Sequence, residues 1–259
     1  EWNRLEDGFV NKVLLVTGAG SGIGAGTAIK FAKEGANVAI VGRNIDKLKR
    51  IAEKCEKIGP KPLIIQSDVS HDESASKIIN EVIATFKKLD VLVNNAGVLK
   101  FGTILKGNLL EAYDTTMVVN VRAPINLTSI AAPHLVKTKG NIINISSLAG
   151  TTAPEKPPTS AYHISKAALS HFSRCAALEL AKHGVRVNTI SPGPVKTDLM
   201  DNAGIGHVKF DDMAKTLPLQ RVSEAGEIAD LIAFLASDRA VGITGSEIFV
   251  DNGYLLKHG

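Results

Sequence analysis

Hydrophobic positions follow two alternating patterns along the whole chain. Short runs rich in Val, Ile and Leu are typical of buried parallel strands, and the stretches between them repeat apolar residues every three or four positions, as amphipathic helices do. The predicted strands are residues 12–17, 36–41, 62–66, 89–93, 140–146, 185–190 and 246–250. The predicted helices are residues 22–34, 44–57, 71–87, 108–137, 160–183 and 224–236. This alternation predicts an α/β fold in which helices cover both faces of a parallel sheet.

Two stretches interrupt this pattern. Residues 153–158 are rich in proline and predict a stiff loop. Residues 195–219 mix apolar residues with glycines, which is typical of an ordinary helical excursion that packs its own apolar face. Because no linker or low-complexity tract separates any part of the chain, we expect a single domain over residues 1–259.

Composition narrows the classes of function. With 259 residues, of which 44% are hydrophobic, the chain can bury one substantial core. The net charge of +4 comes from scattered basic residues, whereas a nucleic-acid protein concentrates them. Cys55 and Cys175 form neither a disulfide framework nor a zinc motif, and we expect both to be packing thiols in a reducing compartment. The histidines suggest no metal site.

The chain has no apolar run of the ~18 residues that span a bilayer. We therefore expect no membrane insertion and a cytoplasmic location. The first residue is Glu1, so the sequence leaves open whether a leader precedes it.

The first predicted strand runs directly into a glycine-rich turn, Thr17-Gly-Ala-Gly-Ser-Gly-Ile-Gly24, and then into a predicted helix. Strand, glycine-rich turn and helix start form the context of a dinucleotide site, because glycines permit close backbone approach and the helix amides attract a pyrophosphate. The alternative is a plain strand-to-helix turn.

Tyr162 and Lys166 lie four residues apart in the predicted helix 160–183 and therefore share one helix face. A lysine charge near a phenol favours the tyrosinate, so we expect Lys166 to lower the pKa of Tyr162 towards the neutral range. That change would suit the phenol for general acid–base chemistry. Alone, the spacing also fits a solvated helix surface.

Further motifs stand in order along the chain: Asp68-Val69, Asn94-Asn95-Ala96-Gly97, Asn120, Ser146-Ser147, Arg186-Val187-Asn188, Pro192-Gly193 and Ile243-Thr244-Gly245. Together with the glycine-rich turn and the Tyr162/Lys166 pair, they resemble the short-chain dehydrogenase/reductase family from about Asn11 to Gly253. The resemblance implies a Rossmann-type doubly wound sheet of seven strands in the order 3-2-1-4-5-6-7. The loop between Ser147 and Tyr162 is longer than is common in this family, so we expect a reshaped pocket roof.

The resemblance also implies a catalytic role for four residues. Tyr162 would exchange a proton with the substrate oxygen, and Lys166 would tune that phenol and bind the nicotinamide ribose. Ser147 would hold the substrate oxygen, whereas the neighbouring Ser146 would pack or cap. Asn120 would hold a water that relays protons to Lys166. Beside this group, we expect His163 to point away from the site.

The cofactor-binding residues implied by the resemblance are Gly18, Ser21, Gly22, Ile23, Gly24, Arg43, Asp68, Val69, Asn95, Tyr162, Lys166, Pro192, Gly193, Val195 and Thr197. Gly42 stands where NAD-preferring members carry an acidic residue, and Arg43 offers a planar group suited to a phosphate. Ser21 argues against NADP(H), because it stands where many NADP enzymes of the family have a second basic residue. We expect NADP(H), with NAD(H) as the alternative.

The resemblance thus predicts an NADP(H)-dependent oxidoreductase that interconverts a ketone and a secondary alcohol. The apolar residues of 195–219, a substrate lid in this family, favour a hydrophobic substrate that is steroid-, terpenoid- or acyl-like. The alternatives are a related isomerase or dehydratase, and a non-catalytic nucleotide-binding scaffold or sensor. Small residues in helices 124–137 and 160–183 could allow the homo-oligomer, a dimer or tetramer, that the family forms, or could face the sheet instead.

Overall fold

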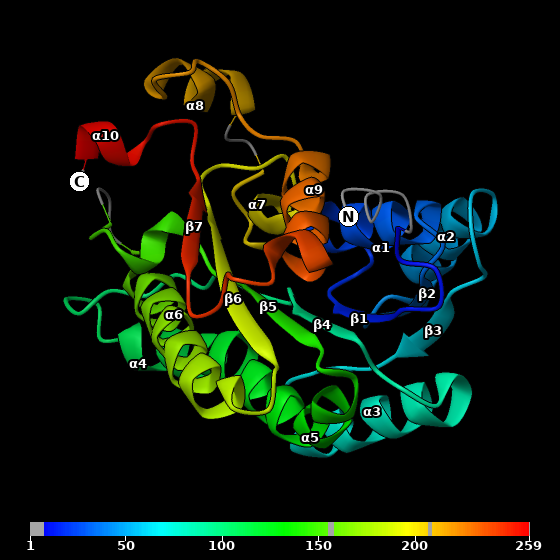
Figure 1. Ribbon diagram of the computed structural model, residues 1–259. Coiled ribbons are helices and arrows are strands. Elements are labelled where there is room, and N and C mark those ends of the chain that lie inside the picture. Colours follow the sequence, from blue (N-terminus) through cyan, green and yellow to red (C-terminus); the bar gives the residue numbers. More distant parts are fainter. Residues whose placement is uncertain (1–7, 155–157, 207–208, 259) are drawn as a thin grey trace.

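A computed structural model describes residues 8–154, 158–206 and 209–258. Its centre is a seven-stranded sheet in which every neighbouring pair is parallel and the order is β3-β2-β1-β4-β5-β6-β7 (Figure 1). The strands are β1 (Val13–Thr17), β2 (Asn37–Gly42), β3 (Leu63–Gln66), β4 (Val91–Asn94), β5 (Asn141–Ile145), β6 (Arg186–Pro192) and β7 (Glu247–Val250). The predicted fold class and strand order are confirmed.

Helices cover both faces of this sheet (Figure 1). One face carries α1 (Gly22–Lys33), α2 (Ile45–Glu56) and α9 (Ala225–Ala236), and the other carries α3 (Asp72–Phe86), α5 (Ala123–Thr138) and α6 (Ser160–Ala181). Each face has its own buried core, because successive strand residues point to opposite sides. Leu14, Val16 and Ile40 belong to the first core, and Leu15, Leu92 and Ile142 belong to the second.

The predicted helix at 108–137 is interrupted in the structure. It consists of α4 (Leu109–Met117), a π-helical segment (Val118–Arg122) and α5, with no break in the chain of helical turns. The wider turn places Asn120 in a fully buried position. A π segment within an α-helix is rare and often marks a functional site.

Short helices that the hydrophobic pattern does not predict lie at the carboxyl end of the sheet. They are α7 (Leu199–Asn202), α8 (Phe210–Thr216) and the C-terminal α10 (Leu255–His258). Figure 1 shows α7 and α8 above the ends of the strands, which is the usual side for a ligand in an open parallel sheet. The middle of the predicted proline-rich loop, residues 155–157, lies outside the described residues, so the expected change in the pocket roof stays a prediction.

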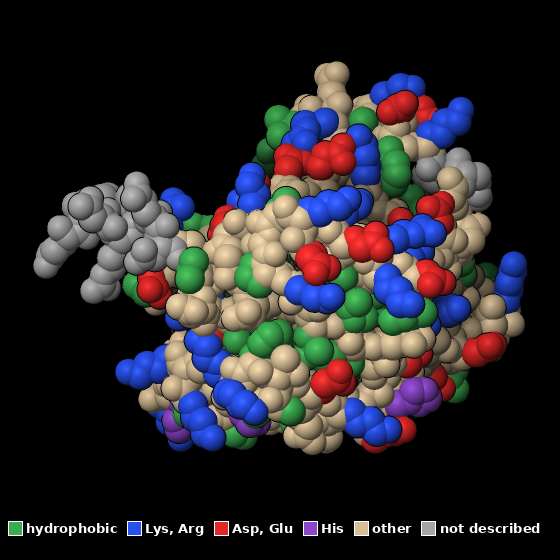
Figure 2. Space-filling view, turned by 90° about the vertical axis from the view of Figure 1, so that its right-hand side faces the viewer, with side chains coloured by type: hydrophobic (Ala, Val, Ile, Leu, Met, Phe, Trp, Pro, Cys, Tyr) green, Lys and Arg blue, Asp and Glu red, His purple; other side chains and the backbone are tan. Residues whose placement is uncertain are grey.

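Charged side chains of both signs are interspersed on the side of the molecule that carries α2 and β3 (Figure 2). Most of the ion pairs of the described residues join partly exposed side chains, as Lys30 does with Glu34 and with Asp230. Among the described residues, none of the helices is both long and apolar enough to cross a membrane. Within those same residues, His, Cys, Asp and Glu side chains do not gather in groups of three that could hold a metal ion.

Candidate active site

The glycine-rich turn connects β1 to α1 and forms the floor of a cavity. Gly18 and Gly22 have φ angles of +67° and +53°, which only glycine adopts readily. A Cβ at Gly22 would lie 2.8 Å from Cγ2 of Thr197, so the lid segment lies directly against the turn. The Ser21 side chain makes no capping hydrogen bond at the start of α1. The amides of this helix start are therefore suited to a phosphate group, as a dinucleotide requires.

Thr17, at the end of β1, and Asn95, directly after β4, hold the turn in place. The Thr17 hydroxyl accepts hydrogen bonds from the backbone N–H groups of Asn95 and Ala96, each at 3.0 Å. In return, Nδ2 of Asn95 donates to the carbonyl oxygens of Thr17, at 2.8 Å, and Gly18, at 3.3 Å. These bonds join two neighbouring strand ends, which makes the cavity floor rigid before any ligand binds.

Gly24 is a predicted cofactor residue with a different position. It does not line the cavity, and a Cβ there would lie 2.5 Å from the carbonyl oxygen of Gly18 and 2.6 Å from Nδ2 of Asn95. Gly24 therefore lets α1 approach the turn closely and would shape the cofactor site without touching its ligand.

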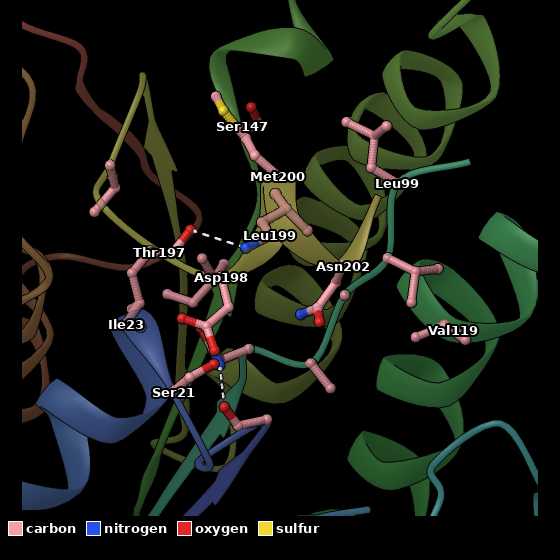
Figure 3. A pocket seen from close by; sticks show the side chains of 18 of the residues that line it. Ser21, Ile23, Leu99, Val119, Ser147, Thr197, Asp198, Leu199, Met200 and Asn202 are labelled. Atoms are coloured by element: carbon pink, nitrogen blue, oxygen red, sulfur yellow. Dashed lines mark hydrogen bonds between the residues drawn. The ribbon is translucent and has the colours of Figure 1, made fainter. Parts of the chain in front are cut away.

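The cavity above this turn has a volume of about 920 Å³ and extends from Arg43 to the lid. Its lining includes all the other predicted cofactor residues: Gly18, Ser21, Gly22, Ile23, Arg43, Asp68, Val69, Asn95, Tyr162, Lys166, Pro192, Gly193, Val195 and Thr197. Figure 3 shows Ser21 and Ile23 on one side of the cavity, Leu99 and Val119 on the other, and Leu199 and Met200 between them.

Tyr162 and Lys166 meet at this cavity from one face of α6. The Nζ atom of Lys166 lies 5.6 Å from the centre of the Tyr162 ring, so the predicted shared face is confirmed. Nζ donates a hydrogen bond to the carbonyl oxygen of Ile145, at 2.8 Å, and Lys166 is only 4% exposed. Ser146 and Ser147 both line the cavity. The Ser146 hydroxyl donates to the carbonyl oxygen of Lys166 at 2.9 Å, whereas the Ser147 side chain hydrogen-bonds with the Tyr162 phenol.

The expected lowering of the Tyr162 pKa is wrong. Burial raises the pKa of the Tyr162 phenol above its ordinary value, and a hydrogen bond with the Ser147 side chain offsets only part of this rise. Burial also lowers the pKa of Lys166 to about 8, because its ammonium loses hydration there. At neutral pH, Tyr162 is thus a neutral phenol and Lys166 is mostly an ammonium.

Asn120 lies in the π segment behind this group and does not line the cavity. Its Oδ1 accepts from the N–H of Val98 at 2.8 Å, and its Nδ2 donates to the carbonyl oxygen of Val98 at 2.9 Å and to Oγ of Ser165 at 3.0 Å. A Cβ on Gly97 would lie 3.5 Å from Oδ1 of Asn120 and 3.7 Å from Nζ of Lys166. Asn120 and Lys166 therefore flank the same backbone position, and the predicted water relay stays a prediction.

Several residues differ from their expected positions. His163 lines the cavity beside Tyr162 instead of pointing away, and one of its ring nitrogens is 3.0 Å from the carbonyl oxygen of Thr159. Cys55 is buried as expected, and burial raises its pKa to about 11, but Cys175 is exposed and is not a packing thiol. Lys47 also lines the cavity, although the sequence analysis did not single it out.

Comparisons with known proteins agree with this geometry. A family model described as Enoyl-(Acyl carrier protein) reductase matches residues 18–255. An uncharacterized oxidoreductase from Thermotoga maritima is 37% identical over 254 residues, which cover 95% of this chain and 98% of that protein. The 3-oxoacyl-[acyl-carrier-protein] reductase FabG from Staphylococcus epidermidis is 36% identical, over 95% of this chain and all of its own length (100%).

Solved structures give the same result. A short-chain dehydrogenase/reductase of unknown function from Caenorhabditis elegans, crystallised with cofactor, matches with a TM-score of 0.89 and 35% identity over 96% of both chains. A short-chain type dehydrogenase/reductase from Mycobacterium marinum matches with a TM-score of 0.90 and 30% identity over 96% of this chain and 97% of its own. The fold, the cavity and these similarities together show that this chain is an oxidoreductase of the short-chain dehydrogenase/reductase family, with a site for a nicotinamide cofactor.

Proposed function

We propose that the chain is an NADP(H)-dependent reductase that converts a hydrophobic ketone into a secondary alcohol and catalyses the reverse reaction. The observation that carries the proposal is the meeting of Tyr162, Lys166 and Ser147 in one cavity with the glycine-rich turn. When bound there, the nicotinamide supplies the hydride for reduction and accepts it for oxidation.

The protonation state of Tyr162 supports the reductive direction. Because burial raises its pKa, the phenol keeps its proton at neutral pH and can give it to an oxygen that gains negative charge. Ser147 shares a hydrogen bond with this phenol and lines the same wall, so its hydroxyl can hold the same substrate oxygen. The Lys166 ammonium would then favour the tyrosinate that is left behind.

The corner of the cavity beside β2 supports NADP(H) over NAD(H). Gly42 has no side chain to repel a 2′-phosphate, and Arg43 lines the cavity with a side chain that is 70% exposed. Arg43 is held only loosely, because its Nη1 lies 3.9 Å from Oδ2 of Asp68. A mobile guanidinium at this corner can turn towards a phosphate and bind it with two hydrogen bonds.

The lid end of the cavity supports a hydrophobic substrate. The apolar side chains that line it are Leu99, Val119, Leu148, Leu199, Met200, Ile205 and Met213. Within the predicted lid at 195–219, Phe210 does not line the cavity and Val208 lies outside the described residues. An apolar wall with few polar groups favours an acyl-, steroid- or terpenoid-like carbonyl compound over a sugar.

The family's homo-oligomer, a dimer or tetramer, is also part of the proposal. Ala131, Ala176 and Ala177 face the sheet core, whereas Ala167 is exposed on α6. On the same helix, Ile164 is 46% exposed and Leu178 is 83% exposed. Exposed apolar residues on this helix favour contact with a second copy.

Turnover of carbonyl compounds is the direct test. NADPH oxidation with a panel of hydrophobic ketones and β-keto thioesters should be easily measured with the wild-type chain. The Tyr162→Phe variant should lose at least about a hundredfold in kcat, as expected when a general acid is removed. Equal turnover by both proteins would contradict the assigned acid.

Two outcomes would favour the alternatives. Conversion of substrate without net NADPH oxidation would indicate an isomerase or dehydratase. Tight cofactor binding without turnover of any carbonyl compound would indicate a scaffold or sensor. The presence of Asn120, Ser147, Tyr162 and Lys166 together favours the redox reaction over both.

A further inference from the structure

Lys47 lies in the first turn of α2 and reaches across the edge of the cofactor cavity. Its Nζ lies 2.5 Å from Oδ2 of Asp198, which precedes α7 in the lid, and both residues line the cavity. The pair joins parts of the chain that are 151 residues apart. Figure 3 shows the Asp198 side chain directed towards the glycine-rich turn at Ser21.

The stem of Lys47 lies directly over this turn. A Cβ on Gly20 would lie 3.2 Å from Cβ of Lys47 and 3.9 Å from its Cδ. The ammonium is therefore positioned above the turn that is suited to bind phosphate. Its side chain is 42% exposed and that of Asp198 is 38% exposed, so the pair is weak enough to exchange partners.

Arg43 and Lys47 mark the same end of the cavity. Asn44 caps α2 between them, and its Oδ1 accepts from the N–H of Lys47 at 2.9 Å. The cap fixes the start of the helix, so both basic side chains leave the backbone at defined positions. A phosphate that enters this corner would meet two cations, each paired with a carboxylate in the structure: Arg43 with Asp68, and Lys47 with Asp198.

We propose that Lys47 is a second determinant of cofactor choice, and that Asp198 competes with the 2′-phosphate of NADP(H) for it. The inference rests on the NADP(H) preference proposed above. An ammonium has three donors and binds phosphate as a point charge, so Lys47 can exchange a carboxylate for a phosphate oxygen without a change of helix position. NAD(H) lacks that phosphate and leaves Lys47 with Asp198.

The test compares dissociation constants for NADPH and NADH, measured by fluorescence titration of the full chain without substrate. Lys47→Met should raise the constant for NADPH about ten- to hundredfold, the usual effect of losing a hydrogen bond to a charged group. The constant for NADH should change by less than about threefold, and Lys47→Arg should restore NADPH binding.

Asp198→Asn should act in the opposite direction. Removing the competing charge should lower the constant for NADPH about two- to fivefold, the free energy of one partly exposed ion pair, and leave NADH binding unchanged. Lys49→Met is the matched control, because Lys49 is exposed on the same helix and does not line the cavity.

Distinct results would overturn each part. If Lys47→Met weakens NADPH and NADH binding equally, Lys47 does not recognise the 2′-phosphate. If Asp198→Asn weakens NADPH binding or leaves it unchanged, there is no competition. If the wild-type chain binds both cofactors equally, the proposed NADP(H) preference itself is wrong. Lys47→Gln provides the same comparison if the methionine variant does not fold.

Discussion

The buried ammonium of Lys166 gives the sharpest prediction, because it makes folding stability depend on pH. Its pKa is about 8 in the native chain and 10.5 when unperturbed. Below pH 8, Lys166 holds its proton in both the native and the unfolded chain, and the native chain carries the cost of burying a charge. Between pH 8 and pH 10.5, Lys166 is neutral in the native chain but still binds the proton in the unfolded chain, so the free energy of unfolding rises with pH.

The size of this effect follows from the two pKa values. One pKa unit corresponds to about 1.4 kcal/mol, so the full difference is about 3 kcal/mol, of which about 2.5 kcal/mol is gained between pH 7 and pH 10. Lys166→Met removes the charge and keeps all but one atom of the length of the side chain. Because all other titrating groups are shared, the difference between wild type and variant isolates Lys166.

Urea denaturation at intervals from pH 7 to pH 10 measures this difference. The wild type should be less stable than Lys166→Met by the largest margin near pH 7, and the margin should shrink as pH rises through 8 and beyond. Lys49→Met, which alters an exposed lysine on the surface of α2, is the control for the substitution itself. A constant margin for Lys166→Met would show that the native pKa is not lowered, and the account of the buried ammonium would fail.

Three further predictions concern packing and titration. Gly24→Ala should lower the free energy of unfolding by about 1–3 kcal/mol in urea and weaken NADPH binding, since its Cβ would collide with backbone; Gly226→Ala, whose Cβ would meet nothing within 4 Å, should not. Asn120→Ala should cost about 2 kcal/mol or more, because it leaves both backbone groups of Val98 unpaired; unchanged stability would contradict this. In ultraviolet titration, Tyr162→Phe should remove absorbance change only above the ordinary tyrosine pKa, and a loss below pH 10 would contradict the effect of burial.

The hydrophobic pattern was sufficient to predict the sheet. Buried parallel strands are nearly continuous apolar runs, so each predicted strand lies within two residues of the observed one at either end. The pattern could not reveal the π segment at Val118–Arg122, because one wider turn leaves the apolar spacing within the range of a regular helix. It also missed α7 and α8, which are too short to show a helical period.

The site was predictable where the chemistry depends on spacing within one element. The shared face of Tyr162 and Lys166 follows from a separation of four residues in α6. The direction in which the Tyr162 pKa shifts could not be predicted from this spacing, because it depends on burial by residues distant in sequence. Lys47 was missed for the same reason: its partner, Asp198, is brought to it only by the tertiary fold.

The π segment has a consequence for how insertions and deletions are tolerated. It lets α4 pack on α6 while α5, directly after it, packs on α3. Each residue of a regular helix turns the chain by about 100°, so deleting one residue between Val118 and Arg122 would rotate all of α4 by that angle relative to α5. The buried residues of α4, Ala112 and Thr116, would then leave their contacts together. Length variation among natural relatives should therefore avoid this turn.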